Sequence, residues 1–273
     1  MSYPPLPEPL PAPVVDNHCH LDIARDGDPL PLAEALGRAA AVGVTRVVQI
    51  GCDLPGARWA VEAAATYDNV VAGVAIHPND APRQQDLEAA LTEIEELATR
   101  PEVRAVGETG LDFFRTGEEG RETQAYAFRR HIDLAKRLDK TLVIHDRDAH
   151  DAVLEVIDSV GPPKRWVMHC FSGDAEFARA CLDRGAYLSF AGTVTFKNAQ
   201  PLRDALALAP QDRLLVETDA PYLTPTPHRG ATNSSYLIPL TMRRMAEVRG
   251  EDLAELCRAV EANTEVAFGG SWG

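Results

Sequence analysis

The chain has 273 residues, of which 45% are hydrophobic, and its formal net charge is −14. This length can bury a sizeable core and fits one large domain, such as a single-domain α/β barrel of about 250 residues, or two small ones. The acidic charge argues against a broad electrostatic grip on duplex DNA, but not against a nuclease that holds one strand end through bound metal cations.

The five cysteines are odd in number and include no Cys-x-x-Cys pair, which is typical of reduced thiols rather than of a disulfide framework. The N-terminus carries neither a basic segment nor an apolar run, and no stretch reaches the ~18 apolar residues of a membrane span. We therefore expect a cytoplasmic protein that does not enter a membrane and that is a monomer or a weak oligomer.

Residues 1–13 contain prolines at positions 4, 5, 7, 9, 11 and 13, which exclude a helix or a central strand. We predict an extended, flexible tail here, with a proline-rich ligand for a partner protein as the alternative. The domain proper is then expected to occupy residues 14–273.

Short apolar runs alternate with helical patterns after this tail. The predicted strands are Val14–Asn17, Arg46–Ile50, Val70–Ala75, Ala105–Gly107, Leu142–Ile144, Arg165–Met168, Tyr187–Phe190 and Leu214–Val216. The predicted helices are Leu32–Val42, Gly56–Tyr67, Gln84–Thr99, Glu122–Leu138, Ala149–Val160, Ala175–Arg184, Gln200–Leu208, Ser235–Arg249 and Asp252–Glu261.

Eight strands alternating with helices in this length predict a (β/α)8 TIM barrel of the α/β class, formed by a single domain. The alternative is an open, doubly wound sheet. Against it, the first strand is not followed by a Gly-x-Gly-x-x-Gly phosphate loop.

His18 and His20 are separated by one residue at the end of the first predicted strand. Side chains two apart on a strand point to the same face, so both imidazoles can reach one metal ion. A pair of polar residues at a strand end, with no metal, is the simpler alternative. The choice between a metal site and a plain polar pair depends on the positions of the other histidines and acidic residues.

Active sites of such barrels lie at the carboxyl ends of the strands. Six metal-binding side chains end predicted strands there: His18, His20, Glu108, His145, His169 and Asp219. So many ligands predict two metal ions, with a carboxylate able to bridge them at ~3.5–4 Å. Mixed imidazole and carboxylate ligands suit Zn, Mn, Fe or Ni and can accept Mg, so we expect two divalent ions such as Mg, Mn or Zn.

The chain from Asp16 to about Phe268 resembles the TatD family of metal-dependent deoxyribonucleases, within the amidohydrolase superfamily, and six segments carry this resemblance. They are Asp16-Asn17-His18-Cys19-His20-Leu21-Asp22, Ile76-His77-Pro78, Gly107-Glu108-Thr109-Gly110-Leu111-Asp112, Ile144-His145-Asp146-Arg147, Met168-His169-Cys170-Phe171-Ser172-Gly173 and Glu217-Thr218-Asp219-Ala220-Pro221-Tyr222-Leu223.

The resemblance implies a role for each ligand. His18, His20 and Asp219 would hold one metal, His145 and His169 the other, and Glu108 would bridge them. The reaction implied is attack on phosphorus by a hydroxide that the two-metal centre activates, with Asp219 taking the proton and Glu108 keeping both metals in place. The implied activity is that of a 3′–5′ exodeoxyribonuclease on single-stranded or frayed DNA ends.

Six further residues are candidates for substrate contacts: His77, Arg147, Ser172, Lys197, Arg229 and Asn233. Each has a structural alternative, such as packing for His77, pairing with a nearby acid for Arg147, a helix N-cap for Ser172 and plain solvation for Lys197. Family members often carry more basic residues between Gly230 and Asn233, where this chain has Ala231 and Thr232, so its substrate preference is open. Cys19 and Cys170 neighbour ligands but are expected to point away from the barrel lumen.

Two other functions stay open at this point. The same centre can attack a carbonyl carbon, as in an amidase, a lactonase or an aminoacyl-ester deacylase. A non-catalytic protein on a hydrolase fold is also conceivable, but its signature would be lost ligands, and all six are present.

Overall fold

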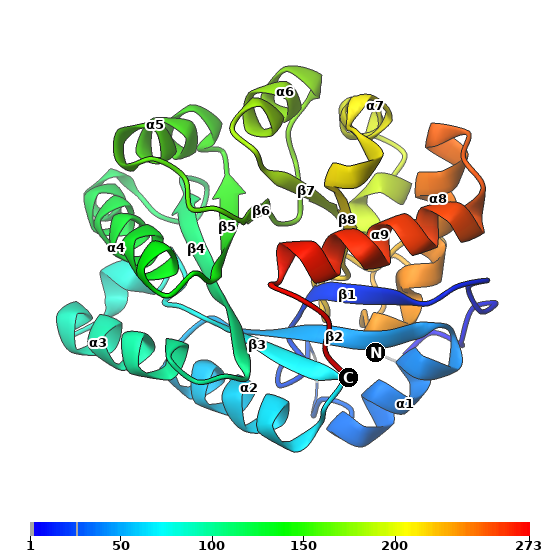
Figure 1. Ribbon diagram of the computed structural model, residues 1–273, viewed down its shortest axis with the longest axis horizontal. Helices are drawn as coiled ribbons and strands as arrows, with labels where there is room; N and C mark the ends of the chain where they lie inside the picture. Colours follow the sequence, from blue (N-terminus) through cyan, green and yellow to red (C-terminus); the bar gives the residue numbers. More distant parts are fainter. Residues whose placement is uncertain (1–2, 26) are drawn as a thin grey trace.

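The computed structural model describes residues 3–25 and 27–273 (Figure 1). Eight parallel strands form one sheet in the order β1 to β8, and each neighbouring pair is hydrogen-bonded. The strands are β1 (Val14–Cys19), β2 (Val44–Gly51), β3 (Val70–Val74), β4 (Val103–Asp112), β5 (Thr141–Arg147), β6 (Trp166–Met168), β7 (Tyr187–Phe190) and β8 (Leu214–Val216).

Helices follow the strands and surround the sheet on its outside (Figure 1). They are α1 (Leu32–Ala41), α2 (Leu54–Thr66), α3 (Leu87–Ala98), α4 (Glu118–Arg137), α5 (His150–Val160), α6 (Ala175–Asp183), α7 (Gln200–Leu208), α8 (Ile238–Arg249) and α9 (Leu253–Ala267). Single 3₁₀ turns are η1 (Ala81–Arg83), η2 (Gly192–Thr195), η3 (Gln211–Arg213) and η4 (Ser235–Leu237). The predicted (β/α)8 barrel is confirmed.

The difference from the predicted elements that matters most for the site is in β4, which continues to Asp112 instead of ending at Gly107. The last helix, α9, also continues further than predicted, to Ala267 instead of Glu261. Two glycines in β4, Gly107 and Gly110, are unfavourable inside a strand, so the sequence pattern indicates an earlier strand end. In the structure β4 passes an irregularity after Val106 and then pairs again with β5, from Thr109 opposite Ile144 onward. This extension carries Glu108 and Asp112 into the mouth of the barrel.

The barrel closes between β8 and β1 through the residues that follow the two strands. The Asp219 N–H donates to the His18 carbonyl over 2.9 Å, and the His20 N–H donates to the Ala220 carbonyl over 2.8 Å. These two hydrogen bonds place Asp219 directly beside the His18 and His20 backbone.

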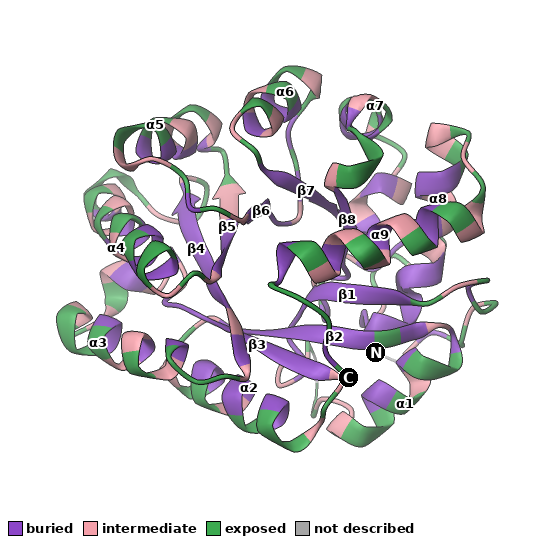
Figure 2. Ribbon diagram, viewed as in Figure 1, coloured by how far each residue is buried: buried purple, intermediate pink, exposed green. Residues whose placement is uncertain are grey.

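The two ends of the barrel differ in chemistry. Apolar side chains such as Val15, Val48 and Val143 fill the lumen, and Phe268 and Trp272 from the C-terminal segment pack against them. The C-terminal segment lies at the amino end of the strands, because Gly273 approaches Arg46 at the start of β2. Figure 1 looks onto this end, and Figure 2 shows that the strands and the inward helix faces are buried. Only the carboxyl end is left for a polar site.

Residues 3–13 of the predicted tail form neither helix nor strand, and residues 1–2 lie outside the described part of the chain. Residues 3–13 are also held to the barrel: the Tyr236 hydroxyl donates to the Pro4 carbonyl over 2.5 Å, and the Arg243 guanidinium donates to the Pro9 carbonyl over 3.0 Å. Leu10 is buried, and its N–H donates to the Val42 carbonyl. Proline removes N–H donors but leaves these carbonyl acceptors available.

Within the described residues, no helix is both long enough and apolar enough to cross a membrane.

Candidate metal centre

Four of the predicted ligands, all histidines, surround the carboxylate of a fifth, Glu108, at the carboxyl end of the strands. Glu108 Oε1 lies 3.4 Å from His18 Nε2 and 3.5 Å from His20 Nε2. Glu108 Oε2 lies 3.1 Å from His145 Nδ1 and 2.9 Å from His169 Nε2. Two separate sets of imidazole nitrogens therefore face the two oxygens of one buried carboxylate.

Asp219 approaches the same two histidines, His18 and His20. Its Oδ1 atom lies 3.5 Å from His20 Nε2 and 3.9 Å from His18 Nε2. The backbone of Asp219 adopts φ +54°, a left-handed conformation that non-glycine residues seldom take and that is often found at functional sites. The hydrogen bond from its N–H to His18 holds this conformation and directs the carboxylate to the two histidines.

Local strand geometry explains how the side chains reach this point. His18 lies on β1 and His20 directly follows this strand. Cys19 between them points outward, with Sγ 3.5 Å from the Val48 carbonyl. Gly107 lets β4 approach β5 closely, because a Cβ there would lie 2.5 Å from Val143 Cβ. The outward direction predicted for Cys19 is confirmed.

His18 gives a direct test of whether these residues fit a metal. Its side chain is fully buried, and among the described residues neither ring nitrogen has a hydrogen-bond partner. Glu108 Oε1 is 3.4 Å away but does not accept a hydrogen bond from it. A buried imidazole without a partner is costly unless something occupies its lone pair. A divalent cation beside Glu108 would do so, and imidazoles with carboxylates are ligands that such ions prefer.

Three of the histidines use their second ring nitrogen on the surrounding protein. His20 Nδ1 lies 2.9 Å from the Ile50 carbonyl, His145 Nε2 lies 3.3 Å from Asp112 Oδ2, and His169 Nδ1 lies 3.2 Å from Glu217 Oε1. Such contacts fix the ring orientation and the tautomer, and they leave the other nitrogen for the centre.

Asp112, Glu217 and Cys52 also contact the cluster, and the sequence reasoning did not single them out. Asp112 and Glu217 stand in the same short motifs as Glu108 and Asp219, which was the available signal. Cys52 directly follows β2, and its thiol donates to Glu108 Oε1 over 3.2 Å. Burial, together with the charge of Glu108, raises the pKa of Cys52 well above its usual value, so the thiol is neutral and can donate.

The carboxylates and imidazoles at the centre shift one another's pKa values. Burial by itself raises the pKa of Glu108, but the neighbouring His169, His77 and His18 hold that pKa well below its usual value. Conversely, burial lowers the pKa of His169, but Glu108 and Glu217 raise it well above the usual value. Burial lowers the pKa of His18, in agreement with a neutral imidazole whose lone pair is available.

Of the six expected substrate contacts, the structure brings His77 to the centre. His77 Nε2 lies 3.7 Å from Glu108 Oε2, and its ring lies 4.7 Å from that of His145. The Asn79 N–H donates to His77 Nδ1 over 3.0 Å and so fixes the ring. His77 can therefore act as a ligand or contact whatever occupies the centre.

The other five expected contacts are placed differently. The guanidinium groups of Arg147 and Arg229 lie over the rings of Phe114 and Phe196, at 4.0 and 3.9 Å from the ring centroids. Lys197 and Ser172 are exposed. Asn233 is buried, and its amide donates to the Thr218 and Tyr222 carbonyls, so it holds the loop after β8.

The N-cap of α6 is Asp174, not Ser172. Its carboxylate accepts the backbone N–H groups of Glu176 and Phe177. The exposed Ser172 hydroxyl caps nothing in the described structure, so the N-cap alternative for Ser172 is wrong.

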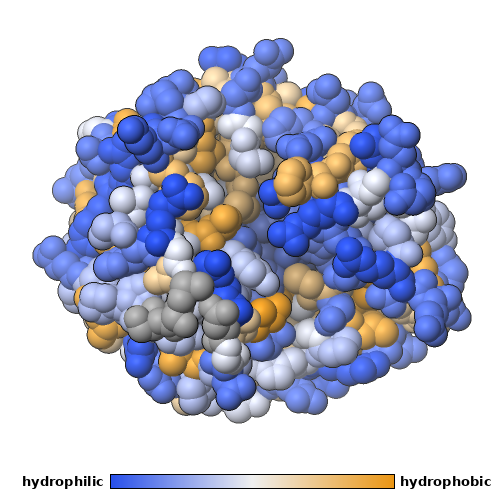
Figure 3. Space-filling model, turned by 180° about the vertical axis from the view of Figure 1, so that it is seen from behind, coloured by the Kyte–Doolittle hydropathy of each residue, from blue (hydrophilic) through white to orange (hydrophobic). Residues whose placement is uncertain are grey.

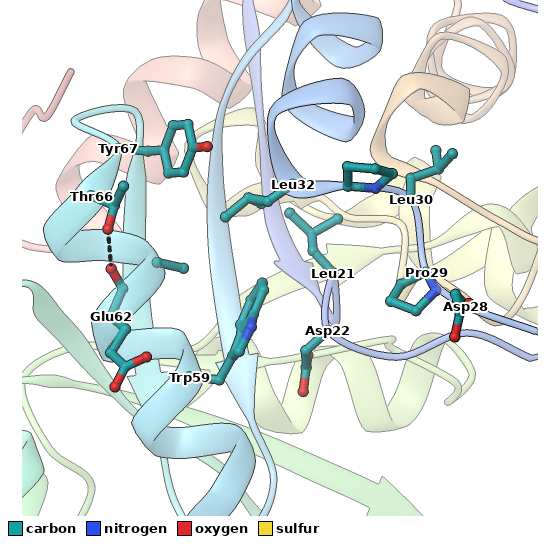
Figure 4. A pocket seen from close by; sticks show the side chains of 12 residues that line it. Leu21, Asp22, Asp28, Pro29, Leu30, Leu32, Trp59, Glu62, Thr66 and Tyr67 are labelled. Carbon is teal, nitrogen blue, oxygen red and sulfur yellow. Dashed lines mark hydrogen bonds between the residues drawn. The ribbon is translucent and has the colours of Figure 1, made fainter.

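The carboxyl end has a hollow near its middle, seen in Figure 3 from the side opposite to Figure 1. A separate cavity of about 530 Å³ lies between the segment 21–32 and α2 (Figure 4). Apolar side chains such as Leu21, Leu32 and Trp59 line it, and the charged groups among its described lining residues are Asp22, Asp28 and Glu62. Such an acidic, apolar cavity suits no phosphate group.

A cluster of histidines and carboxylates at the carboxyl end of a (β/α)8 barrel defines a metal-dependent hydrolase. A family model described as "TatD related DNase" matches residues 15–269, and the chain belongs to this family.

Relatives and solved structures agree with the family. The "uncharacterized metal-dependent hydrolase TatD" of Mycobacterium tuberculosis is 46% identical, over 95% of this chain and 99% of the relative. A protein of Escherichia fergusonii named "3′-5′ ssDNA/RNA exonuclease TatD" is 37% identical, over 85% of this chain and 90% of the relative. The crystal structure of YjjV, a TatD homologue from Escherichia coli, has a TM-score of 0.86 at 28% identity and covers 94% of this chain and 98% of that one.

Proposed function

We propose that this protein is a phosphodiesterase that shortens single-stranded DNA from the 3′ end with the help of two divalent metal ions. The observation that carries the proposal is Glu108, whose Oε1 and Oε2 atoms face two different pairs of histidines. A carboxylate in this position bridges two ions in enzymes with two-metal sites. The exonuclease name of the Escherichia fergusonii relative supports the substrate and the polarity.

Each ion has a defined set of ligands in this proposal. His18, His20 and Asp219 would hold one ion, and His145 and His169 would hold the other, with Glu108 shared between the two sets. Bound Mg, Mn or Zn would supply an acidified water and positive charge for the phosphate oxygens.

Asp219, not Glu108, is the residue that accepts the proton from the attacking water. The Asp219 side chain is 16% exposed, whereas the Glu108 side chain is 5% exposed and surrounded by imidazoles. Of these two carboxylates, Asp219 is therefore the more accessible to solvent. Its Oδ1 atom accepts the proton, and the neighbouring His20 Nε2, 3.5 Å away, keeps the carboxylate in place.

The first test is cleavage of end-labelled single-stranded DNA by metal-stripped protein with Mg²⁺, Mn²⁺ or Zn²⁺ added back. Labels at the 5′ and the 3′ end in separate reactions report the polarity, and an RNA strand of the same sequence forms a second arm. We expect shortening from the 3′ end that requires metal. Intact strands with every metal, together with hydrolysis of a fluorogenic ester or amide, would reject the phosphodiesterase and favour the carbonyl chemistry.

Glu108→Ala should lose both ions, because both sets of ligands depend on this carboxylate. Asp219→Asn should weaken only the ion at His18 and His20. The metal content of each protein after dialysis, measured by elemental analysis, checks this difference. Glu155→Ala, an exposed glutamate on α5, is the matched control. Two ions retained by Glu108→Ala would contradict the bridging role.

A further inference from the structure

Phe114 presents a large aromatic ring to solvent at the carboxyl end of the barrel. It follows β4 by two residues and is 62% exposed. The guanidinium of Arg147, the last residue of β5, lies 4.0 Å from the centroid of this ring. Arg147 covers one face of the ring, and the high exposure of Phe114 leaves much of the rest open.

Phe114 and Arg147 are fixed to the metal centre through Asp112. The Phe114 N–H donates to Asp112 Oδ1 over 3.0 Å, and Asp112 Oδ2 lies 3.3 Å from His145 Nε2. Asp112 also pairs with Arg147 in the register between β4 and β5. One carboxylate therefore links the exposed ring to a ligand of the centre, and the two strands hold the arginine beside it.

A ring stacked on a guanidinium has two uses for a nucleic acid. The open face of the ring can stack on a base of any sequence. The guanidinium keeps N–H donors at its edge, which can bind a phosphate while its plane stays on the ring. A base in a duplex is already stacked and paired, so this arrangement favours an unpaired base.

We propose that Phe114 and Arg147 form a stacking platform for an unpaired nucleobase close to the phosphodiester bond that is cleaved. This inference rests on the proposed function, and it assigns the preference for single strands to two named side chains. The platform binds the base and the adjoining phosphate and takes no part in the bond cleavage itself.

The decisive comparison uses two single strands that differ in one feature, the presence or absence of bases at the end that is degraded. Steady-state rates on the normal and the abasic strand are measured for the wild type, Phe114→Ala, Phe114→Trp and Arg147→Gln. Phe114 is mostly exposed, so its replacement should leave the fold intact, which a circular dichroism melt checks.

Tyr126→Ala is the matched control. Tyr126 is another exposed aromatic residue with an arginine, Arg130, near its ring, but it lies on α4 and its hydroxyl donates to Glu88. Tyr126 and Arg130 have the chemistry of the platform but lie elsewhere. Tyr126→Ala should therefore change neither the rate on the normal strand nor the rate on the abasic strand.

For Phe114→Ala we expect kcat/KM on the normal strand to fall about 5-fold to 100-fold, mostly through a higher KM. The abasic strand should be equally slow with the wild type and with Phe114→Ala, and Phe114→Trp should restore the rate on the normal strand. An unchanged KM for Phe114→Ala on a strand that the wild type degrades overturns the platform alone. A wild type that degrades neither strand overturns the proposed function, and the platform with it.

Discussion

His169 shows how single side chains set the geometry of the centre. Its Nε2 atom reaches Glu108, and its Nδ1 atom lies 3.2 Å from Glu217 Oε1. Glu217 is fully buried, and within the described residues its second oxygen has no hydrogen-bond partner. Burying a carboxylate costs free energy. The contact of Glu217 with His169 therefore indicates that Glu217 serves the function of this histidine. In the proposed metal centre, Glu217 would orient the ring and make Nε2 a stronger ligand.

Replacing Glu217 by Gln should weaken metal binding about 10- to 100-fold, because the amide keeps the size and one acceptor but loses the charge. Competition with a coloured chelator measures the affinity. Glu155→Gln on the surface of α5 is the control for the loss of one negative charge. An affinity equal to that of the wild type would show that Glu217 serves only the packing around β8.

At the scale of the elements, the strand order and the gathering of histidines and acids at the strand ends could be predicted from the sequence. The carboxyl ends of parallel strands meet at one rim, so His18, Glu108 and His169 had to come close wherever each strand ended. Asp112 and Cys52 could not be assigned, because their contacts depend on the strand register and on side-chain direction. The late pairing of β4 with β5 after Val106, which brings Asp112 to His145, is such a feature.

Asp174, the N-cap of α6, is expected to contribute to the thermal stability of the protein. Asp174→Ala should lower the thermal midpoint by about 2–4 °C, because two backbone N–H groups lose their acceptor. Ser172→Ala should leave the midpoint unchanged. The hydrogen bond from the Phe177 N–H lowers the pKa of Asp174, so the cap is present at neutral pH and is lost as the solution becomes acidic enough to protonate it. Equal midpoints for the two variants would reject this assignment.

For the whole molecule, the free energy of unfolding depends on keeping a buried histidine, His131, in its neutral form. His131 on α4 is 1% exposed and lies far from solvent between the helix and the sheet. Its Nδ1 atom lies 2.8 Å from Thr109 Oγ1, and the Ile76 N–H donates to Nε2. Both contacts suit a neutral ring, which donates from one nitrogen and accepts at the other. Burial, with a smaller effect of the charge on Arg130, lowers the pKa of His131 to about 3.

This shift predicts a loss of stability in mild acid. An unfolded histidine has a pKa of about 6.5, so between pH 6.5 and pH 3 the unfolded chain binds a proton that the folded protein does not. The stabilisation is fully present above pH 6.5 and decreases as the pH falls, by about 2 kcal/mol at pH 5.

Urea unfolding at pH 7.5 and pH 5.0, both with EDTA to exclude metal binding, measures the difference in the free energy of unfolding. His131→Gln should reduce the difference between the two pH values by about 2 kcal/mol, because glutamine has no proton to gain. His228→Gln, in the loop after β8, should leave it unchanged. If His131→Gln loses as much stability between the two pH values as the wild type, the buried ring is not the group that makes the folded barrel sensitive to acid.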